Sequence, residues 1–319
     1  MDIYSVGPRL KKGAEQVIKG KALFLEALIT GLLGKGHVLI EDMPGVGKTT
    51  VAKTLAHLVA DGQGKPLSFK RIQCTPDVLP YDITGVDVFD PETRSFRFLP
   101  GPVFAHFVLA DEINRTTPKV QSALLEAMAE QQVTIGTTTH HLSEPFMVIA
   151  TQNPVETEGT YPLPVAQLDR FMMRLSVGYP DRDAELEILS ENPAETVLHE
   201  IQPVVQKEEL LAARAAVTNL YCHQELKESI ADLVRSTREH PDIHLGCSPR
   251  AGLHLLMACK ARALLHGRNY VTDEDVLFLA PAVLAHRVQL RDPRARAEPL
   301  IQDLAHHYLK KHVALSNIS

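Results

Sequence analysis

Short apolar runs alternate with helical patterns through the first part of the chain. Residues 49–60 (TTVAKTLAHLVA) repeat apolar side chains at helical spacing, and similar patterns separate runs of strand length. These runs are HVLIE (37–41), SFKRIQ (68–73), FVLAD (107–111), PFMVIATQN (145–153) and RLSVG (174–178). Apolar strands separated by helices indicate a parallel sheet covered on both faces. We therefore predict an α/β core built on a five-stranded parallel sheet.

Two further stretches interrupt this alternation and read as hairpins. Residues 86–104 (VDVFDPETRSFRFLPGPVF) carry apolar residues on either side of a DPET turn, and residues 131–146 (QQVTIGTTTHHLSEPF) turn around Gly136. Neither hairpin is needed to complete the sheet. Because segments inserted on a rigid core often carry binding residues, both are candidates for contact with a substrate or partner.

From about Pro180 onward the pattern becomes helical throughout. Helical patterns cover residues 181–192, 206–217, 223–240, 248–267 and 272–288, and the intervening residues 191–203 read as a polar link. Strand patterns fade over the same part of the chain. We therefore predict two domains, an α/β core over residues 1–181 and a small all-helical domain over residues 182–319.

The composition is that of a globular protein, with 45% hydrophobic and 23% charged residues among 319. A net charge of −6 and a pI of about 6.2 supply no general attraction to nucleic acid or to an anionic membrane. The apolar runs 22–34 and 276–285 are too short to span a bilayer, and the first residues lack a secretory signal. We expect a cytoplasmic protein without membrane insertion. No C-x-x-C spacing occurs, so buried thiols are expected at Cys74, Cys222, Cys247 and Cys259.

The stretch EDMPGVGKTT (41–50) is a near match to a phosphate-binding loop. The signature G-x-x-x-x-G-K-[ST] uses glycines that let backbone N–H groups converge on an anion at a helix N-terminus, as Gly45 and Gly47 would here. Lys48 would then reach the β- and γ-phosphate oxygens, and the Thr49 hydroxyl would ligate Mg²⁺. Asp42 replaces the first glycine, which mainly eases the exit from the strand. Asp42→Gly is therefore expected to change ATP binding only a few-fold.

Two later strands end in polar residues that suit hydrolysis of a bound phosphate. The run FVLAD ends in Asp111 and is followed by Glu112. Asp111 would hold Mg²⁺, often through water, and Glu112 would polarise the attacking water as a general base. Asn153, at the end of the next strand, could orient the same water. The alternative is a pair of solvated acids and a turn asparagine, so this interpretation depends on the phosphate loop upstream.

Two arginines are further candidates. Ser248 is a good N-cap and Pro249 a good first helical residue, so Arg250 lies in the first turn of a helix. The helix dipole favours anions at this end, and an arginine there makes sense if it faces an anion such as the γ-phosphate. Arg170 follows the YPLP turn and does not plainly reach the phosphate of its own subunit. The alternative for Arg170 is a surface salt bridge worth about 0–1 kcal/mol.

Together these motifs resemble those of AAA+ ATPases, and more narrowly those of the MoxR family. The resemblance runs from about residue 15 to the final helices. Its most specific stretches are HVLIEDMPGVGKTTVAKTLA, IQCTPDVLPYDITG, FLPGPVFAHFVLADEINRTTPKVQSALLEAMAEQQVTI, IATQNPVETEGTYPLPVAQLDRFMMR and SPRAG. In this family an acidic residue often stands where Asp42 does, and two insertions lie where the hairpins are predicted.

The resemblance implies roles for individual residues. Asn153 would be the first sensor, and Arg250 the second sensor on the helical lid. Arg170 would be an arginine finger that reaches the ATP of a neighbouring subunit, and Arg174 is considered as an additional interface arginine. Positions that match nucleotide contacts, including the VIKG segment expected beside adenine, are Val17, Ile18, Gly20, Pro44, Gly45, Val46, Gly47, Lys48, Thr49, Thr50 and Asp111. Of these, Thr49 and Asp111 would hold the metal.

The resemblance also implies a fold and an activity. The expected fold is an AAA+ core with two hairpin insertions and a helical lid. The expected activity is Mg²⁺-dependent ATP hydrolysis between subunits of a homo-oligomeric ring, a hexamer, which acts as a chaperone on a client protein complex. A von Willebrand factor A domain protein is a candidate partner, and a chelatase-type assembly factor is a close relative.

Two alternatives stay open. One is a nucleic-acid-remodelling motor, although the hairpin segment VTIGTTTHHL has no Lys or Arg to contact phosphates. The other is a nucleotide-gated binding module with little turnover, against which Glu112 and the two arginines argue. We therefore do not expect a nucleic-acid partner.

Overall fold

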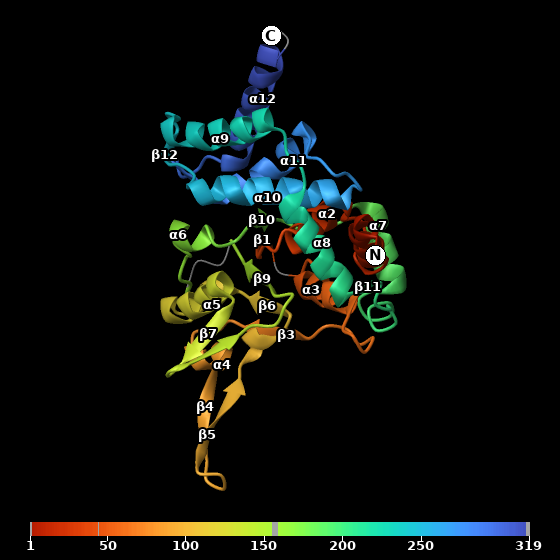
Figure 1. The fold of residues 1–319 in the computed structure, drawn as a ribbon, viewed down its shortest axis with the longest axis vertical. Helices are drawn as coiled ribbons and strands as arrows, with labels where there is room; N and C mark the ends of the chain where they lie inside the picture. The colour runs from red at the N-terminus through yellow and green to blue at the C-terminus, as the bar shows by residue number, and fades with distance from the viewer. Residues whose placement is uncertain (1, 44, 155–158, 317–319) are drawn as a thin grey trace.

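The computed structural model describes residues 2–43, 45–154 and 159–316 (Figure 1). At its centre lies a five-stranded sheet with the order β10-β1-β9-β6-β3, and all neighbouring strands are parallel. The strands are β1 (Val38–Glu41), β3 (Phe69–Gln73), β6 (Phe107–Asp111), β9 (Met147–Gln152) and β10 (Met173–Leu175). The predicted five-stranded parallel sheet is confirmed, and its last strand ends earlier than the run RLSVG suggested.

Both faces of this sheet are buried. Val38 and Ile40 of β1 belong to one apolar cluster, while Leu39 between them belongs to a second cluster on the other face. The apolar strand runs of the sequence reflect this burial on two sides.

Helices and 3₁₀ turns surround the sheet in this part of the chain. They are η1 (Ile3–Ser5), α1 (Val6–Val17), α2 (Ala22–Leu33), α3 (Lys48–His57), α4 (Pro80–Thr84), η2 (Pro102–Phe104), η3 (Ile113–Arg115), α5 (Pro118–Glu130) and α6 (Val165–Leu168).

Two antiparallel hairpins extend from the core where the sequence predicts them. The first pairs β4 (Gly85–Asp90) with β5 (Ser95–Pro100) and projects to the end of the molecule opposite the C-terminus (Figure 1). The second pairs β7 (Gln132–Ile135) with β8 (Thr138–His141). The hairpins meet where the ring of His140 stacks on Phe98, with 3.9 Å between the ring centroids.

A short strand pairing joins the core to the later chain and was not predicted. The helix α3 ends at His57, and β2 (Val59–Ala60) pairs in parallel with β11 (Val205–Gln206). The prediction of a helix through residue 60 is therefore wrong. The backbone N–H groups of Val204 and Val205 both donate to the Leu58 carbonyl, so a tertiary pairing overrides the local helical pattern.

Helices dominate the rest of the chain. Their bounds, with the short strands and the 3₁₀ turn between them, are α7 (Arg182–Glu191), α8 (Lys207–Asn219), α9 (Gln224–Glu239), β12 (Ile243–Leu245), α10 (Pro249–Leu265), α11 (Asp273–Leu284), η4 (Ala285–Arg287), β13 (Gln289–Leu290) and α12 (Ala297–Ser316). Helices α9 to α12 gather at one end of the molecule as a helical lid (Figure 1). Helix α8 packs against α2 and η1 of the core, and the predicted domain boundary between residues 181 and 182 stays a prediction.

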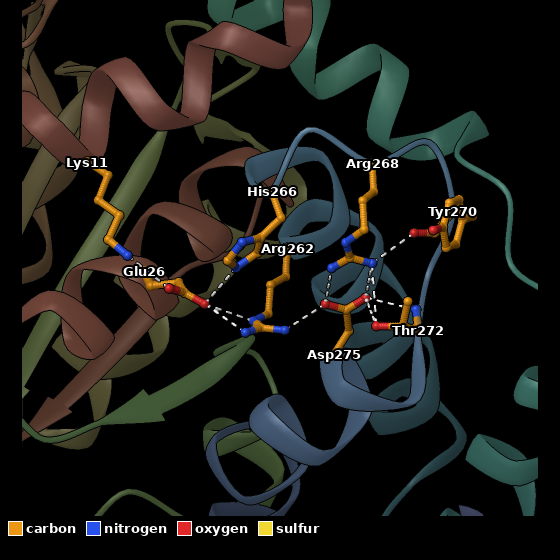
Figure 2. A network of polar contacts seen from close by, with 8 residues as sticks. All are labelled: Lys11, Glu26, Arg262, His266, Arg268, Tyr270, Thr272 and Asp275. Atoms are coloured by element: carbon orange, nitrogen blue, oxygen red, sulfur yellow. Dashed lines mark hydrogen bonds and ion pairs between the residues drawn. The ribbon is translucent and has the colours of Figure 1, made fainter.

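A network of charged side chains joins α1 and α2 to the lid helices α10 and α11, with Glu26 on the core side (Figure 2). The side chain of Glu26 is 5% exposed, and that of Asp275 is fully buried. Burial raises the pKa of Glu26, but hydrogen bonds with His266 and Lys11 outweigh burial and bring it down to about 2. Ion pairs of 2.7 to 2.9 Å connect Lys11, Glu26, Arg262, Arg268 and Asp275, and His266 Nε2 hydrogen-bonds to Glu26 at 2.9 Å. These pairs fix the lid on the core.

The four cysteines are buried and unpaired, as predicted. Burial raises the pKa of Cys74 to about 12, so that thiol stays protonated. Within the described parts of the chain, no helix combines the length and the apolar character that crossing a membrane requires.

Candidate functional site

The loop after β1 has the backbone conformation that phosphate binding requires. Gly45 and Gly47 adopt φ angles of +86° and +83°, and a Cβ at either position would have no neighbour within 4 Å. The left-handed backbone therefore favours glycine, and crowding does not. Gly47 is the N-cap of α3, so the first N–H groups of that helix are available to an anion at the loop. Pro44 lies outside the described residues.

Asp42 ties the start of this loop to the chain after β10. Its carboxylate accepts hydrogen bonds from the N–H of Met43 (2.9 Å), the hydroxyl of Ser176 (2.9 Å) and the N–H of Gly178 (2.6 Å). Burial raises the pKa of Asp42, but these hydrogen bonds outweigh burial and hold the pKa below its usual value. The backbone carbonyl of Asp42 accepts a hydrogen bond from Lys48 Nζ at 2.9 Å. Asp42 therefore holds the loop from both its main chain and its side chain.

A pocket of about 530 Å³ opens beside the loop. The loop forms one wall of this pocket and residues 177–180 form a second. Ile188 and Leu189 of α7 form a third wall. Of the predicted nucleotide contacts, the pocket brings together Val17, Ile18, Gly45, Val46, Gly47 and Thr50. A largely apolar pocket of this size next to a helix N-terminus suits a base and sugar whose phosphates lie on the loop.

Helix α7 is held over this pocket by the segment that follows α1. Lys19 Nζ pairs with Glu187 Oε1 at 2.6 Å, and Lys21 Nζ donates to the Tyr179 carbonyl at 2.5 Å. Gly20, at φ +66°, packs against Ala184 of α7, where an added Cβ would lie 2.7 Å from the Ala184 Cβ. Gly20 is thus placed by packing against α7, and it does not line the pocket.

The carboxyl ends of β6 and β9 bring the predicted hydrolytic residues to the same sheet edge as the phosphate loop. Asp111 ends β6 and Asn153 follows β9, and both are buried. The Thr151 hydroxyl donates to Asp111 Oδ1 at 2.6 Å and accepts from the Glu112 N–H at 2.8 Å. Glu112 has φ +59°, a left-handed conformation that is uncommon outside glycine. The sheet therefore places Asp111, Glu112 and Asn153 together.

Side chains from β3 and η3 contact both acids. Arg71 of β3 donates to Asp111 Oδ2 from Nε at 3.0 Å and from Nη2 at 2.5 Å. Gln73 and Arg115 both donate to Glu112 Oε2, at 3.2 Å and 3.1 Å. These contacts were not predicted, because the stretch FKRIQ indicates a strand but not what its exposed side chains meet.

Arg170 and Arg250 line a different pocket, of about 340 Å³, at the opposite edge of the sheet. Gly36 and His37, which precede β1, line the same pocket, whereas the phosphate loop follows the other end of β1. The length of that strand, about 13 Å for four residues, separates the two edges. The described lining of this second pocket contains no phosphate-loop residue, so the two arginines lie apart from the loop of the same chain.

Asp169 joins the loop that carries Arg170 to the helix that carries Arg250. The helix α10 begins at Pro249 with Ser248 at the N-cap, as predicted, but the Ser248 hydroxyl makes no capping hydrogen bond. It donates to Asp169 Oδ2 at 3.0 Å instead. Arg287 Nε donates to Asp169 Oδ1 at 2.7 Å from a side chain that is 1% exposed. Core and lid therefore place the two arginines together.

Arg174 has two acidic partners within the subunit. Its guanidinium donates to Glu41 Oε2 at 2.8 Å and to Glu298 Oε1 at 2.7 Å. These contacts join the strand before the phosphate loop to α12 of the lid. The role of Arg174 at a subunit interface stays a prediction.

The oxygen donors at the loop fit Mg²⁺. This ion prefers oxygen ligands and usually takes one or two from the protein, with others from substrate phosphates and water. Asp111 supplies a buried carboxylate, and Thr49 supplies a hydroxyl in the first turn of α3. In the described parts of the chain, no three His, Cys, Asp or Glu side chains come together to hold a metal ion. Asp111 and Thr49 would therefore hold a metal that bound phosphates complete.

Several residues of the site were missed from the sequence. Tyr179, Ile188 and Leu189 line the pocket, yet the pattern of residues 181–192 predicts only a helix and not the surface that it covers. The one available signal was the position of this helix directly after the last strand. Arg71 gave no signal, because alternation along a strand indicates exposure and not a partner.

Comparison with known proteins identifies the family. The family described as "ATPase family associated with various cellular activities (AAA)" matches residues 37–173, and the AAA lid domain matches residues 235–304. Chaperone MoxR1 of Mycobacterium tuberculosis (strain ATCC 25618 / H37Rv) is 40% identical over 285 residues, which cover 86% of this chain and 74% of MoxR1. The chain belongs to the MoxR family of AAA+ ATPases.

Further similarities agree with membership of the MoxR family. Protein YeaC of Bacillus subtilis (strain 168) is 47% identical over 294 residues, with 91% of this chain and 90% of YeaC covered. A crystal structure from Cytophaga hutchinsonii superposes with a TM-score of 0.86 at 37% identity and covers 95% of this chain and 94% of its own. The predicted resemblance and fold class are confirmed.

Proposed function

We propose that this MoxR-family protein hydrolyses ATP with Mg²⁺ between the subunits of a homo-oligomeric ring, a hexamer. One observation carries the proposal: the candidate residues are divided between two opposite edges of the sheet. The phosphate loop, the two acids at the end of β6 and Asn153 after β9 lie at the carboxyl edge, whereas Arg170 and Arg250 lie at the amino edge. Subunits arranged head to tail in a ring would bring the amino edge of one to the carboxyl edge of the next.

Each residue has a role in this reaction. The N–H groups of the phosphate loop and Lys48 hold the phosphates, and Glu112 accepts a proton from the attacking water while Asn153 orients it. When bound, Mg²⁺ held by Thr49 and Asp111 supplies positive charge to the phosphate oxygens. Arg170 and Arg250 of the next subunit stabilise the charge that develops on the γ-phosphate.

The base lies in the pocket beside Val17 and Ile18, under α7. The predicted adenine segment and the phosphate loop line this one pocket, and Ile188 and Leu189 supply apolar surface for the adenine base. This placement supports ATP as the nucleotide.

A client protein is the partner that the surface favours. The β4–β5 hairpin exposes Val88, Phe89 and Phe96, of which Phe96 is 71% exposed, and the β7–β8 hairpin carries no Lys or Arg. Apolar side chains suit contact with a protein better than contact with a phosphodiester chain. Remodelling or activation of a client complex and a von Willebrand factor A domain protein as partner follow from the family resemblance, and the cytoplasm as location follows from the sequence pattern.

Steady-state ATP turnover, measured over a range of protein concentrations, tests the proposal. Turnover per subunit should rise with concentration as the ring assembles. Glu112→Gln should bind ATP and turn it over about 10²- to 10⁴-fold more slowly, while Glu15→Gln, an exposed control on α1, should match the wild type. Equally slow turnover by wild type and Glu112→Gln at every concentration would indicate a nucleotide-gated binding module. Salt-sensitive DNA binding with a non-hydrolysable ATP analogue would indicate a nucleic-acid motor.

A further inference from the structure

Arg71 occupies one oxygen of the carboxylate that would hold the metal. Its Nε and Nη2 both donate to Asp111 Oδ2, at 3.0 Å and 2.5 Å. A carboxylate oxygen has two lone pairs, so these two hydrogen bonds fill the acceptor capacity of Oδ2. The same Nη2 also donates to Gln73 Oε1 at 2.6 Å, which holds the guanidinium in place from a second side.

The two oxygens of Asp111 differ in how firmly their partners are held. Thr151, which donates to Oδ1, is buried in the middle of the sheet. Arg71 lies on β3 at the edge of the sheet, and its side chain is 46% exposed, against 12% for Asp111. Arg71 is therefore the partner that can move into solvent, and Oδ2 is the oxygen that its departure would free.

A metal ion and Arg71 cannot share this oxygen. Mg²⁺ binds a carboxylate oxygen at about 2.0–2.1 Å and needs near-octahedral ligands around it. A guanidinium that donates two hydrogen bonds to the same oxygen occupies that space and repels a dication. Metal binding at Oδ2 and the Arg71–Asp111 pair therefore exclude each other.

We propose that Arg71 competes with the divalent cation for Asp111 and so makes metal binding depend on ATP. The inference rests on the proposed function, in which Asp111 holds the metal. Without nucleotide, Asp111 and Thr49 offer too few ligands to displace Arg71. Phosphate oxygens supply the ligands that are missing, so the metal enters together with ATP. Arg71 acts through Asp111 and is a positioning residue.

Binding of Mn²⁺ to the full-length protein, followed by the loss of the free-ion EPR signal, tests this inference without relying on turnover. In the absence of nucleotide, Arg71→Gln should bind Mn²⁺ at least about fivefold more tightly than the wild type. Arg71→Lys keeps the positive charge but not the bidentate contact, so its Mn²⁺ affinity should lie between those of Arg71→Gln and the wild type. Arg97→Gln, at an exposed position on the β4–β5 hairpin, controls for the loss of one positive charge. Asp111→Asn in the Arg71→Gln background should remove the gain.

With a non-hydrolysable ATP analogue present, both proteins should bind Mn²⁺ more tightly than without it, because the phosphate oxygens supply further ligands. Equal Mn²⁺ affinity of the two proteins without nucleotide, or no measurable binding by either, would overturn the inference. That result would leave the proposed function standing if the wild type still hydrolysed ATP. Absence of ATP hydrolysis by the wild type would instead remove the proposed function.

Discussion

The backbone N–H of Gly178 donates a hydrogen bond to the carboxylate of Asp42, with 2.6 Å between N and Oδ2. Asp42 begins the phosphate loop, whereas Gly178 lines the wall of the pocket beside it. The two residues lie 136 positions apart in the chain. The contact therefore couples the position of the loop to the shape of the pocket.

Loss of this carboxylate should affect both stability and nucleotide binding. Asp42→Ala leaves the N–H of Gly178 and the hydroxyl of Ser176 without their acceptor, which should lower the free energy of unfolding by about 1–3 kcal/mol. ATP affinity should fall about tenfold, equivalent to about 1.4 kcal/mol, because the pocket wall is no longer tied to the loop. Urea unfolding and isothermal titration calorimetry measure the two effects.

Asp303→Ala, at an exposed position on α12, provides the control for the Asp42 variant. The sequence alone predicts only a few-fold effect at Asp42, because it shows a strand exit and not the distant partners. An ATP affinity of Asp42→Ala within a few-fold of the wild type would favour that simpler view. It would show that the hydrogen bonds to residues 176–178 do not shape the pocket.

Lys48→Ala should weaken nucleotide binding about 100-fold. Its ammonium, which contacts the Asp42 carbonyl, is the charged donor expected to contact the phosphates, and its loss accounts for this weakening. Lys53→Ala removes an exposed lysine from the same helix and should bind like the wild type. Micromolar ATP affinity retained by Lys48→Ala would argue against the phosphate-loop assignment.

Truncation of Glu26 should loosen the lid from the core. Glu26→Ala leaves Arg262 and Lys11 without their shared buried partner, and removing one member of a buried ion pair costs about 3–5 kcal/mol. Thermal or urea unfolding measures this loss, and Glu15→Ala on the exposed side of α1 is the control. A change of less than about 1 kcal/mol would show that the network contributes no more than surface ion pairs do.

Stability should fall as the pH drops from about 6.5 toward 4. Burial lowers the pKa of His37 and of His254 to about 4, so both stay neutral in the folded protein. In the unfolded chain the imidazole pKa is about 6.5, so below this pH the unfolded state binds more protons and gains stability relative to the folded state. Each histidine should contribute a slope of up to about 1.4 kcal/mol per pH unit.

Urea unfolding at pH 7, 6 and 5 measures this dependence. His37→Gln should reduce the slope of the free energy of unfolding against pH by up to about 1.4 kcal/mol per pH unit, which corresponds to one proton. His244→Gln, at an exposed position, should leave the slope unchanged. Equal slopes for wild type and His37→Gln would show that His37 does not take up its proton on unfolding.

Local features of this fold could be predicted from the sequence. The strands that end in Glu41 and Asp111 are continuous apolar runs buried on both faces, and Gly45 and Gly47 lie where the backbone needs a left-handed conformation. These signals are contained within a few residues. The phosphate loop and the two acids at the end of β6 therefore followed from short patterns alone.

Features that depend on distant packing could not be predicted. The β2–β11 pairing involves two residues on each side, too few to show a pattern. The edge of the sheet that Arg250 faces is set by how α10 packs on the core through Asp169, which no local pattern contains. The contact of Arg71 with Asp111 arises from the register of β3 against β6, where Gln73 lies opposite Asp111.

The proposed division of the site between two subunits has a direct consequence for Arg170→Ala. This variant keeps the phosphate loop and should bind ATP normally, but its turnover should fall by about 10³- to 10⁵-fold because the neighbouring site lacks its arginine. Arg235→Ala, at an exposed position on α9, should retain full turnover.

Mixing of two inactive variants tests the claim of a shared site most directly. Arg170→Ala subunits supply an intact phosphate loop, and Lys48→Ala subunits supply an intact Arg170. In rings formed from equal amounts of both, about one quarter of the sites should combine the two, and ATP turnover should recover to that fraction of the wild-type value. Turnover of the mixture that stays at the sum of the two inactive variants would contradict the proposal that Arg170 acts on the ATP of its neighbour.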